Sequence, residues 1–286
     1  MNNSKESRKL VLIGDLIEDV MVKLDGPLQV GLNNRGRVRR VIGGSAANVA
    51  RVAVRTTSVR FIGRIGVDRA GDELVAELKE TGVEVCVQRE GRTGAVIILV
   101  DEKGERTMVP DRGSGKDLDL VDQSWLVGSA WLHFTGYGLV TQSSTRALVA
   151  AAEYAKTLGA VVSIDLASAH ILDELIADGT FYTLIETIDP DFVFANDDEL
   201  RAIDRMRVST GRYLLGMHGE NPITAETNGN IREIKVELVP GVVDTTGAGD
   251  AFVGGFIAAR LRDATIEHSV QSGAVAAREA IARLGG

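Results

Sequence analysis

The chain has 286 residues, of which 44% are hydrophobic and 25% are charged, as is usual for a globular protein with a buried core. Its net charge of −8 and isoelectric point near 5.2 argue against nucleic acid or an anionic membrane as a partner. One cysteine excludes an internal disulfide, and the polar start and lack of a long apolar run indicate neither export nor membrane insertion. We therefore expect a cytoplasmic protein.

Short strands and two helices are predicted in the first third of the chain. The apolar run Lys9–Gly14 is typical of a buried strand. Helices are predicted over Ser45–Val54 and Asp72–Thr81, and Gly82 suits a left-handed cap at the end of the second. Four more runs have the composition of short strands: Met21–Leu24, Arg37–Ile42, Ala95–Val100 and Arg106–Val109.

Strands and helices then alternate regularly beyond Asp117. The predicted order is strand Ala130–Phe134, helix Ser143–Leu158, strand Val161–Ile164, a helix around Leu172–Ala177 and strand Phe192–Phe194. This rhythm predicts an α/β fold with a mostly parallel sheet covered on both faces. The short strands within about 20–42 and 94–110 do not follow it, so we expect them to form a small projecting β-sheet, a lid.

Ligands of parallel sheets bind beyond the carboxyl ends of the strands. The polar or small residues that directly follow predicted strands are therefore of interest: Asp15, Gly136, Asp165 and Asn196.

Residues 244–256 read D-T-T-G-A-G-D-A-F-V-G-G-F and carry the most specific chemistry. A turn of Gly247, Ala248 and Gly249 precedes an apolar helical run, so unpaired N–H groups at the helix start can bind a phosphate. An acid beside that site, Asp250, fits a general base that deprotonates an attacking hydroxyl. The alternative interpretation is an ordinary helix start after a glycine turn, with Asp250 as an N-terminal acid.

A second group of residues surrounds G-G-S-A-A-N at positions 43–48. The paired glycines Gly43 and Gly44 predict a close backbone approach or a hinge, followed by a helix that contains Asn48. Together with Asp15 and Asp19, this amide would form a receptor for vicinal hydroxyls. The alternative is a plain turn followed by an exposed asparagine.

Taken together, Gly43–Val83 and Asp244–Phe256 resemble the two signatures of the ribokinase family, the PfkB-type carbohydrate kinases. The resemblance covers nearly the whole chain and implies one kinase domain over residues 1–286, built as a three-layer α/β/α sandwich with a Rossmann-like sheet and a β lid. It implies transfer of the γ-phosphoryl group of ATP to a primary hydroxyl of a small sugar or sugar acid of the ribose, fructose or 2-keto-3-deoxygluconate type.

The resemblance also assigns roles to single residues. Asp250 would be the base, with Gly247, Ala248 and Gly249 as the anion hole, and the sugar would bind Asp15, Asp19, Gly43, Gly44 and Asn48. Asn196 and Glu199 match an N-x-x-E motif that organises Mg²⁺ and phosphates. Their spacing predicts that both lie on one helical face. Gly216 and Gly219 match a nucleotide-binding turn, and Asp244 and Thr246 match a site for a monovalent cation such as K⁺.

One segment departs from the family pattern. Residues 201–219 look too short for the helix, strand and turn expected there, and Leu214 stands where a hydroxyl side chain is common. Two other functions stay open: a nucleoside kinase of the same fold, which the 5% aromatic content disfavours, and a sugar-binding sensor with weak catalysis. The family resemblance also implies a homodimer formed through the lid.

Overall fold

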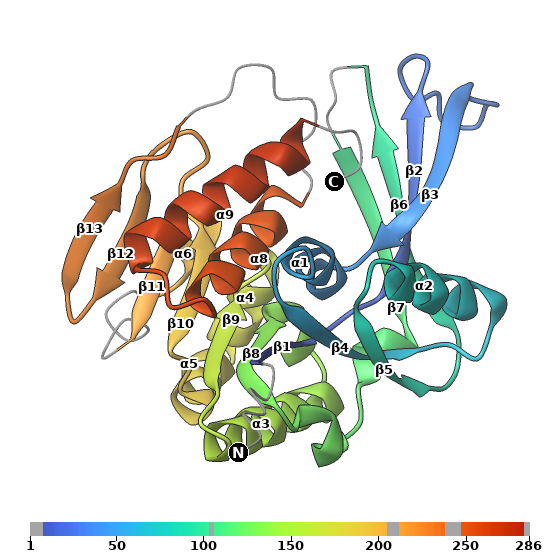
Figure 1. The fold of residues 1–286 in the computed structure, drawn as a ribbon. Coiled ribbons are helices and arrows are strands. Elements are labelled where there is room, and N and C mark those ends of the chain that lie inside the picture. Colours follow the sequence, from blue (N-terminus) through green and yellow to red (C-terminus); the bar gives the residue numbers. More distant parts are fainter. Residues whose placement is uncertain (1–7, 103–105, 205–211, 238–246, 283–286) are drawn as a thin grey trace.

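A computed structural model gives the fold of the chain and describes residues 8–102, 106–204, 212–237 and 247–282. The main feature is a sheet of nine strands (Figure 1). Its strands, in the order in which they lie side by side, are β13 (Asn230–Ile234), β12 (Ile223–Thr227), β11 (Tyr213–Met217), β10 (Phe192–Asn196), β9 (Val161–Asp165), β8 (Ser129–Thr135), β1 (Lys9–Ile13), β4 (Ser58–Ile65) and β5 (Glu84–Arg89). The strands from β5 to β11 pair in parallel, and β12 and β13 extend the sheet with antiparallel pairs.

Helices cover both faces of this sheet. One face carries α1 (Ser45–Ala53), α2 (Arg69–Glu80), α8 (Ala248–Arg260) and α9 (Ile266–Ile281), and the other carries α3 (Gln142–Thr157), α4 (Ala169–Ala177), α5 (Thr180–Ile188) and α6 (Asp197–Ala202). In β1, Leu10 and Leu12 belong to the core under the first group, whereas Val11 and Ile13 belong to the core under the second. This alternation follows from the two-residue period of a strand.

Four further strands form a separate small sheet, which we call the lid sheet. They are β3 (Gly36–Gly43), β2 (Ile17–Leu24), β6 (Thr93–Val100) and β7 (Arg106–Gly113), in that order across the sheet. The outer pairs are antiparallel and the central pair, β2 with β6, is parallel. Apolar side chains on one face of the lid sheet are buried together: Ile17, Met21, Val96 and Ile98. Asp19 is two residues from Ile17 and two from Met21 along β2, so its side chain lies on that same face.

Three short 3₁₀ helices complete the described elements. They are η1 (Ser114–Asp117), η2 (Gln123–Leu126) and η3 (Gly136–Leu139). The first directly follows β7, and the third directly follows β8, so both begin where a strand ends.

The predicted fold class is confirmed: a mostly parallel sheet, helices on both faces and a small extra sheet are all present. The strands of the lid sheet are longer than predicted, and β7 runs on to Gly113. Helix α2 begins at Arg69, earlier than expected, because the Asp68 carboxylate caps it by accepting a hydrogen bond from the Gly71 N–H at 2.9 Å. Gly82 has the predicted left-handed conformation, with a φ of 97°.

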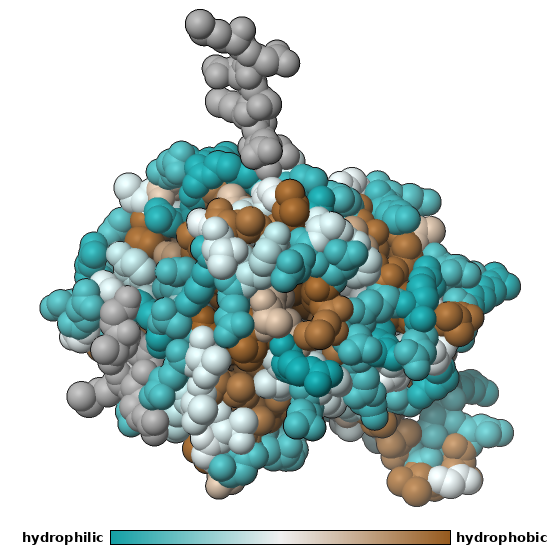
Figure 2. All heavy atoms as spheres, turned by 90° about the horizontal axis from the view of Figure 1, so that it is seen from below, coloured by the Kyte–Doolittle hydropathy of each residue, from teal (hydrophilic) through white to brown (hydrophobic). Residues whose placement is uncertain are grey.

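Figure 2 shows the molecule from below, where hydrophilic and hydrophobic side chains alternate in small groups. The strand β1 runs from this side toward the lid sheet in Figure 1, so the carboxyl ends of the parallel strands face the lid sheet. Within the described ranges, none of the helices combines the length and apolar character that a membrane span requires.

Candidate active site

Asp250 lies in the first turn of α8, and two side chains from the start of α1 hold its carboxylate. The Ser45 hydroxyl donates to Oδ1 at 2.6 Å, and the Asn48 side-chain amide donates to Oδ2 at 2.9 Å. Because each oxygen accepts a hydrogen bond, the carboxylate has a fixed direction. The two glycine-rich segments of the sequence therefore meet at this point.

The backbone before Asp250 forms a group of donors. The backbone of Gly247 has the left-handed helical conformation, with a φ of 71°. The first hydrogen bond of α8 runs from the N–H of Ala251 to the Gly247 carbonyl at 2.8 Å. The N–H groups of Ala248, Gly249 and Asp250 precede that bond, and a glycine at the N-cap offers no side chain to cap them. A cup of this kind binds a phosphate group.

Burial raises the pKa of Asp250, while the hydrogen bonds from Ser45 and Asn48 act in the opposite direction. The net effect is a pKa above the usual value of an aspartate, which makes the carboxylate a better proton acceptor than an exposed one.

Asp19 reaches the same place from the lid sheet. Burial, and secondarily the charge of Asp250, raise the pKa of Asp19 to about 6. A Cβ on Gly43 would lie 2.2 Å from the Asp19 carboxylate, and one on Gly44 would lie 2.2 Å from the Asp15 carbonyl oxygen. Gly44 also has a φ of 101°. Both glycines are thus required by close approaches, which is one of the two interpretations that the sequence allowed.

Asp15 and Arg112 form a buried ion pair beside these residues. Arg112 Nε donates to Asp15 Oδ2 at 2.7 Å and its Nη2 donates to Oδ1 at 2.9 Å. The third donor, Nη1, bonds the Tyr137 carbonyl at 2.8 Å. Burial and the charges of Asp250, Asp165 and Glu199 raise the pKa of the Tyr137 phenol, so this ring lies among the carboxylates of the site.

Asp165 and Glu199 form an acidic pair at the ends of β9 and β10. Burial raises the pKa of Asp165, and the charges of Glu199 and Asp250 raise it further. Burial also raises the pKa of Glu199. Two buried carboxylates this close repel each other unless a cation lies between them or one is protonated. Carboxylate oxygens are the ligands that a hard divalent cation prefers.

Asn196 and Glu199 bond each other, although not as two positions on one helical face. Asn196 is the N-cap of α6, and its Oδ1 accepts bonds from the N–H groups of Asp198 and Glu199. In return, Glu199 accepts from the Asn196 backbone N–H and side-chain amide, each at 2.8 Å. This reciprocal capping box fixes the Glu199 carboxylate at the end of β10.

The segment 201–219 looked too short to hold both a strand and a turn, but the structure contains the strand β11 and a turn after it. Gly216 lies inside β11, where a Cβ would lie 2.3 Å from Thr224 Oγ1, and Gly219 lies in the following turn with a φ of 60°. Between them, His218 bonds Asp197 and Thr224. A Cβ on Gly249 would touch Met217 Cε at 3.9 Å, so the end of β11 adjoins the donor cup. Asp244 and Thr246 lie outside the described residues.

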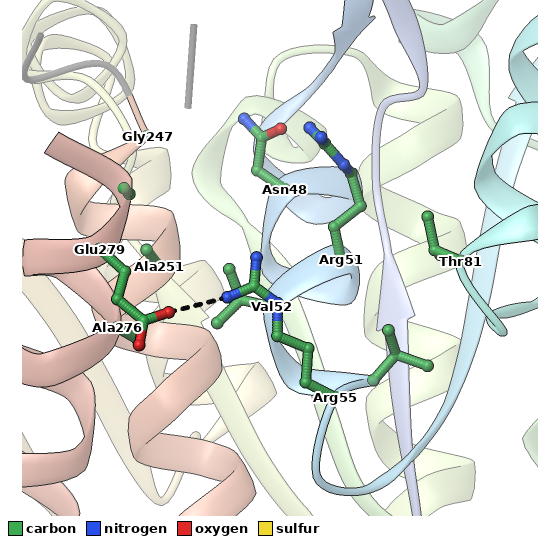
Figure 3. Close-up of a pocket in the computed structure, with 11 residues that line it drawn as sticks. Asn48, Arg51, Val52, Arg55, Thr81, Gly247, Ala251, Ala276 and Glu279 are labelled. Carbon is green, nitrogen blue, oxygen red and sulfur yellow. Dashed lines mark hydrogen bonds and ion pairs between the residues drawn. The ribbon is translucent and has the colours of Figure 1, made fainter. Parts of the chain in front are cut away.

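A cavity of about 310 Å³ lies between α1, α8 and α9 (Figure 3). It reaches the site only through Asn48 and Gly247, and an ion pair between Arg55 and Glu279 crosses its wall. The acidic residues of the site do not line it. It lies beside the start of α8, and neither Asp19 nor Asp250 lines it.

Four residues of this site carried no assigned role in the sequence interpretation: Ser45, Arg112, Tyr137 and Asp165. Asp165 and Gly136, which precedes Tyr137, stand at strand ends, and that signal pointed to their position. Ser45 is part of the G-G-S-A-A-N segment, but its bond to Asp250 joins residues 205 positions apart and leaves no local signal.

The chain is similar to known proteins over most of its length. The chain matches the profile of the pfkB family carbohydrate kinases over residues 7–206 and 223–286. The profile omits the segment between 206 and 223, where the sequence departs from the family pattern. A fructokinase of Klebsiella pneumoniae is 30% identical over 268 residues, which cover 87% of this chain and 83% of that protein.

Adenosine kinases are also similar. Adenosine kinase 2 of Arabidopsis thaliana is 25% identical over 300 residues, covering 91% of this chain and 83% of that protein. The crystal structure of adenosine kinase from Sinorhizobium meliloti has the same fold, with a TM-score of 0.85 at 22% identity over 97% of this chain and 95% of that one. Because the family profile spans most of the sequence, the chain belongs to the pfkB family of carbohydrate kinases and is a sugar kinase.

Proposed function

We propose that the enzyme transfers the γ-phosphoryl group of ATP to a primary hydroxyl of a small sugar or sugar acid of the ribose, fructose or 2-keto-3-deoxygluconate type. The observation that carries this proposal is the Asp250 carboxylate, held by Ser45 and Asn48 next to the first amides of α8, for which the described residues supply no side-chain cap. An oriented base and an oxyanion-type donor site are the two parts that phosphoryl transfer needs from a protein.

Each residue then has one task. Asp250 accepts the proton of the acceptor hydroxyl while the oxygen of that hydroxyl forms a bond to the γ-phosphorus. The bond between the γ-phosphorus and the bridging oxygen of ADP breaks at the same time. The N–H groups of Ala248, Gly249 and Asp250 stabilise the charge on the phosphoryl oxygens. Asp19, with the backbone at Gly43 and Gly44, binds the other hydroxyls of the acceptor. The Asn48 amide orients Asp250 and faces the same site.

The family uses ATP with a divalent metal, and we propose Mg²⁺, held by Asp165 and Glu199. The fit rests on two buried carboxylates, of which Glu199 raises the pKa of Asp165, because oxygen ligands of this kind suit a hard divalent cation. When bound, the metal neutralises charge on the β- and γ-phosphates. Asn196 positions Glu199 for this task, and Gly216 in β11 and Gly219 in the turn after it would line the nucleotide side. Binding of K⁺ by Asp244 and Thr246 stays a prediction.

A nucleoside acceptor is the second candidate, because an adenosine kinase is among the relatives. Nucleoside sites commonly stack the base on aromatic rings. Tyr137 is the aromatic side chain that adjoins the acidic residues in the described part of the chain, and it stacks against Arg112 instead, with 5.9 Å from the guanidinium carbon to the ring centre. This arrangement favours a sugar over a nucleoside.

We also propose that two copies associate through the lid sheets. The face of the lid sheet opposite Asp19 carries Val38, Ile97 and Val109, whose side chains are 62%, 38% and 57% exposed. A second copy that covers this face would bury them. Analytical ultracentrifugation should show a dimer, and Val109→Glu should give a monomer. A monomeric wild-type protein at micromolar concentration would contradict the proposal.

A coupled assay of ADP release, run over pentoses, hexoses, keto acids and nucleosides with Mg²⁺ and ATP, tests the proposed function. We expect turnover with at least one sugar. Turnover with nucleosides alone would instead support the nucleoside kinase. Binding of a sugar by calorimetry without any ADP release would support a sensor.

A further inference from the structure

Arg112 is the cation of the acceptor side of the site. It comes from the end of β7 in the lid sheet, and its guanidinium lies over the ring of Tyr137. The charges of Asp250, Asp165 and Glu199 raise the pKa of Tyr137, and the charge of Arg112 lowers it. An arginine in this position is the group expected to recognise a carboxylate or phosphate on the acceptor.

The structure gives this arginine a different partner. Asp15 accepts two hydrogen bonds from it, at 2.7 and 2.9 Å, in the fork geometry that matches a guanidinium to a carboxylate. The two side chains are only 17% and 9% exposed, so solvent screens the pair little. Asp15 thus occupies the face of Arg112 that an anionic substrate would need.

The position of Asp15 is also fixed from behind. Its backbone carbonyl packs against Gly44, where even a Cβ would approach within 2.2 Å. The third bond of Arg112, to the Tyr137 carbonyl, holds the guanidinium from the side of the main domain. This packing fixes the Asp15 backbone, and the two hydrogen bonds from Arg112 orient its carboxylate.

With Arg112 paired to Asp15, the buried carboxylates of Asp19 and Asp250 act on each other at the acceptor position. Burial gives each of them a raised pKa, and a further negative charge beside them would be repelled. A neutral sugar offers hydroxyl donors to both carboxylates and brings no charge.

We propose that Asp15 is a specificity-determining residue that reserves Arg112 for itself, so that the enzyme accepts neutral sugars and rejects sugar acids and sugar phosphates. The proposal rests on the proposed function and narrows its acceptor class. It assigns to Asp15 a task different from direct binding of sugar hydroxyls.

A matched pair of acceptors tests this without any mutation. D-fructose and 2-keto-D-gluconate share the stereochemistry of carbons 3 to 5 and the primary hydroxyl of carbon 6, and they differ in the group at carbon 1. We expect kcat/KM for the neutral sugar to exceed that for the acid by at least about 100-fold, because like charges in a buried site exclude a partner strongly. The same comparison with D-ribose and D-ribonate covers a pentose acceptor.

Two variants move the ratio in opposite directions. Asp15→Asn keeps the shape of the side chain and removes its negative charge, so Arg112 becomes available to an anionic acceptor. The ratio of kcat/KM for the neutral sugar to that for the acid should fall by about 10-fold or more. Arg112→Gln removes the cation and should leave the acid without measurable turnover. Glu18→Gln is the matched control, because Glu18 pairs with Arg40 on the opposite face of the lid sheet, and it should leave the ratio unchanged.

The outcomes separate this inference from the proposed function. Equal wild-type turnover of sugar and sugar acid overturns the inference while the enzyme remains a sugar kinase. An unchanged ratio in folded Asp15→Asn overturns it as well. If neither member of either pair is phosphorylated but a nucleoside is, the proposed function fails first. Circular dichroism on each variant establishes that it is folded before the ratios are compared.

Discussion

Ser45 and Asn48 fix the direction of the Asp250 carboxylate and also stabilise its charged form. These two effects can be separated by pH. A hydrogen bond that fixes direction changes the rate at every pH, whereas one that stabilises the anion moves the pH at which the base becomes active.

Ser45→Ala should lower kcat by about 10-fold and shift the acid limb of the kcat profile to higher pH. The sign follows from the pKa: the Ser45 bond opposes the effect of burial on Asp250, so its loss raises the pKa of that carboxyl further. The measurement is kcat against pH between 5 and 9. Ser272→Ala removes a hydroxyl that bonds only the His268 carbonyl on α9 and should leave the profile unchanged. An acid limb in Ser45→Ala at the wild-type position would contradict this role.

For single residues, the sequence predicted Asp250 and the glycines before it, but it did not predict which side chains contact them. Asp250 and Gly247 belong to one short motif, and their chemistry follows from the start of a helix. The prediction that Asp15 binds sugar hydroxyls did not include its contact with Arg112, because a contact between residues 97 positions apart has no local signature. Burial and charge at such positions arise only when distant segments meet.

At the start of α6, the residues that cap the helix are also residues of the candidate site. The reciprocal bonds of Asn196 and Glu199 start α6, and the same carboxylate adjoins Asp165. One residue thus contributes both to the stability of a helix and to the proposed metal site.

Glu199→Gln should raise the Mg²⁺ concentration needed for half-maximal activity by about 10-fold or more, because a charged ligand is lost. The amide oxygen still accepts the bond from the Asn196 N–H, so we expect a stability loss of only about 1 kcal/mol. The measurements are a Mg²⁺ titration of activity and urea unfolding. Asp198→Asn, an exposed acid in the same turn, is the control. An unaltered Mg²⁺ requirement in Glu199→Gln would remove this carboxylate from the metal site.

Asp68 links α2 to the lid sheet. Besides capping α2, its carboxylate accepts bonds from the Thr93 N–H at 2.8 Å and from the Thr93 hydroxyl, at the first residue of β6. Asp68→Ala should therefore cost more than about 1 kcal/mol in unfolding free energy and also raise KM for the acceptor.

Thr265→Ala is the comparison, because it removes the cap of α9, which lies in the main domain. This variant should lose about 1 kcal/mol with an unchanged KM. If both variants change stability and neither changes KM, Asp68 serves only as a cap.

The elements themselves were predicted where local pattern was strong. Helix α3 and strands β8 to β10 follow from an alternation of apolar runs and polar caps. Strands β4 and β11 to β13 were not assigned, and short polar-rich strands such as Asn230–Ile234 resemble loops. The antiparallel pairing of β12 and β13 is decided by the neighbouring strand.

His133 lies in β8, in the centre of the main sheet, and its protonation affects the stability of the whole molecule. The ring is fully buried, its Nδ1 bonds Ser163, and its Nε2 has no partner among the described residues. Burial lowers the pKa of His133 to about 3. The folded protein therefore keeps the ring neutral, while the unfolded chain binds a proton below a pH of about 6.5.

Because the unfolded state binds more protons, stability falls as the pH drops from about 6.5 toward 3, by up to about 1.4 kcal/mol per pH unit. His133→Leu should remove this contribution and flatten the dependence of the unfolding free energy on pH. Urea unfolding at several pH values measures it. His170→Gln, at a site 85% exposed, should retain the wild-type slope. Equal slopes in wild type and His133→Leu would contradict the assignment.

For the whole molecule, the alternation of strands and helices was enough to predict the sandwich, and the motifs were enough to predict the family. The order of strands was not available from either, because it depends on which sheet edge each crossover returns to. That order brings β9 and β10 beside β8 and β1, and so places Asp165 near Asp250.

The account depends on Asp250 as the base of phosphoryl transfer. The most direct test is Asp250→Asn, with acceptor binding measured by calorimetry and phosphoryl transfer measured in a single turnover with ATP. We expect the transfer rate to fall by a factor on the order of 10² to 10⁴ while the acceptor affinity stays within about threefold of wild type. Transfer at a near-wild-type rate in this variant would contradict the account.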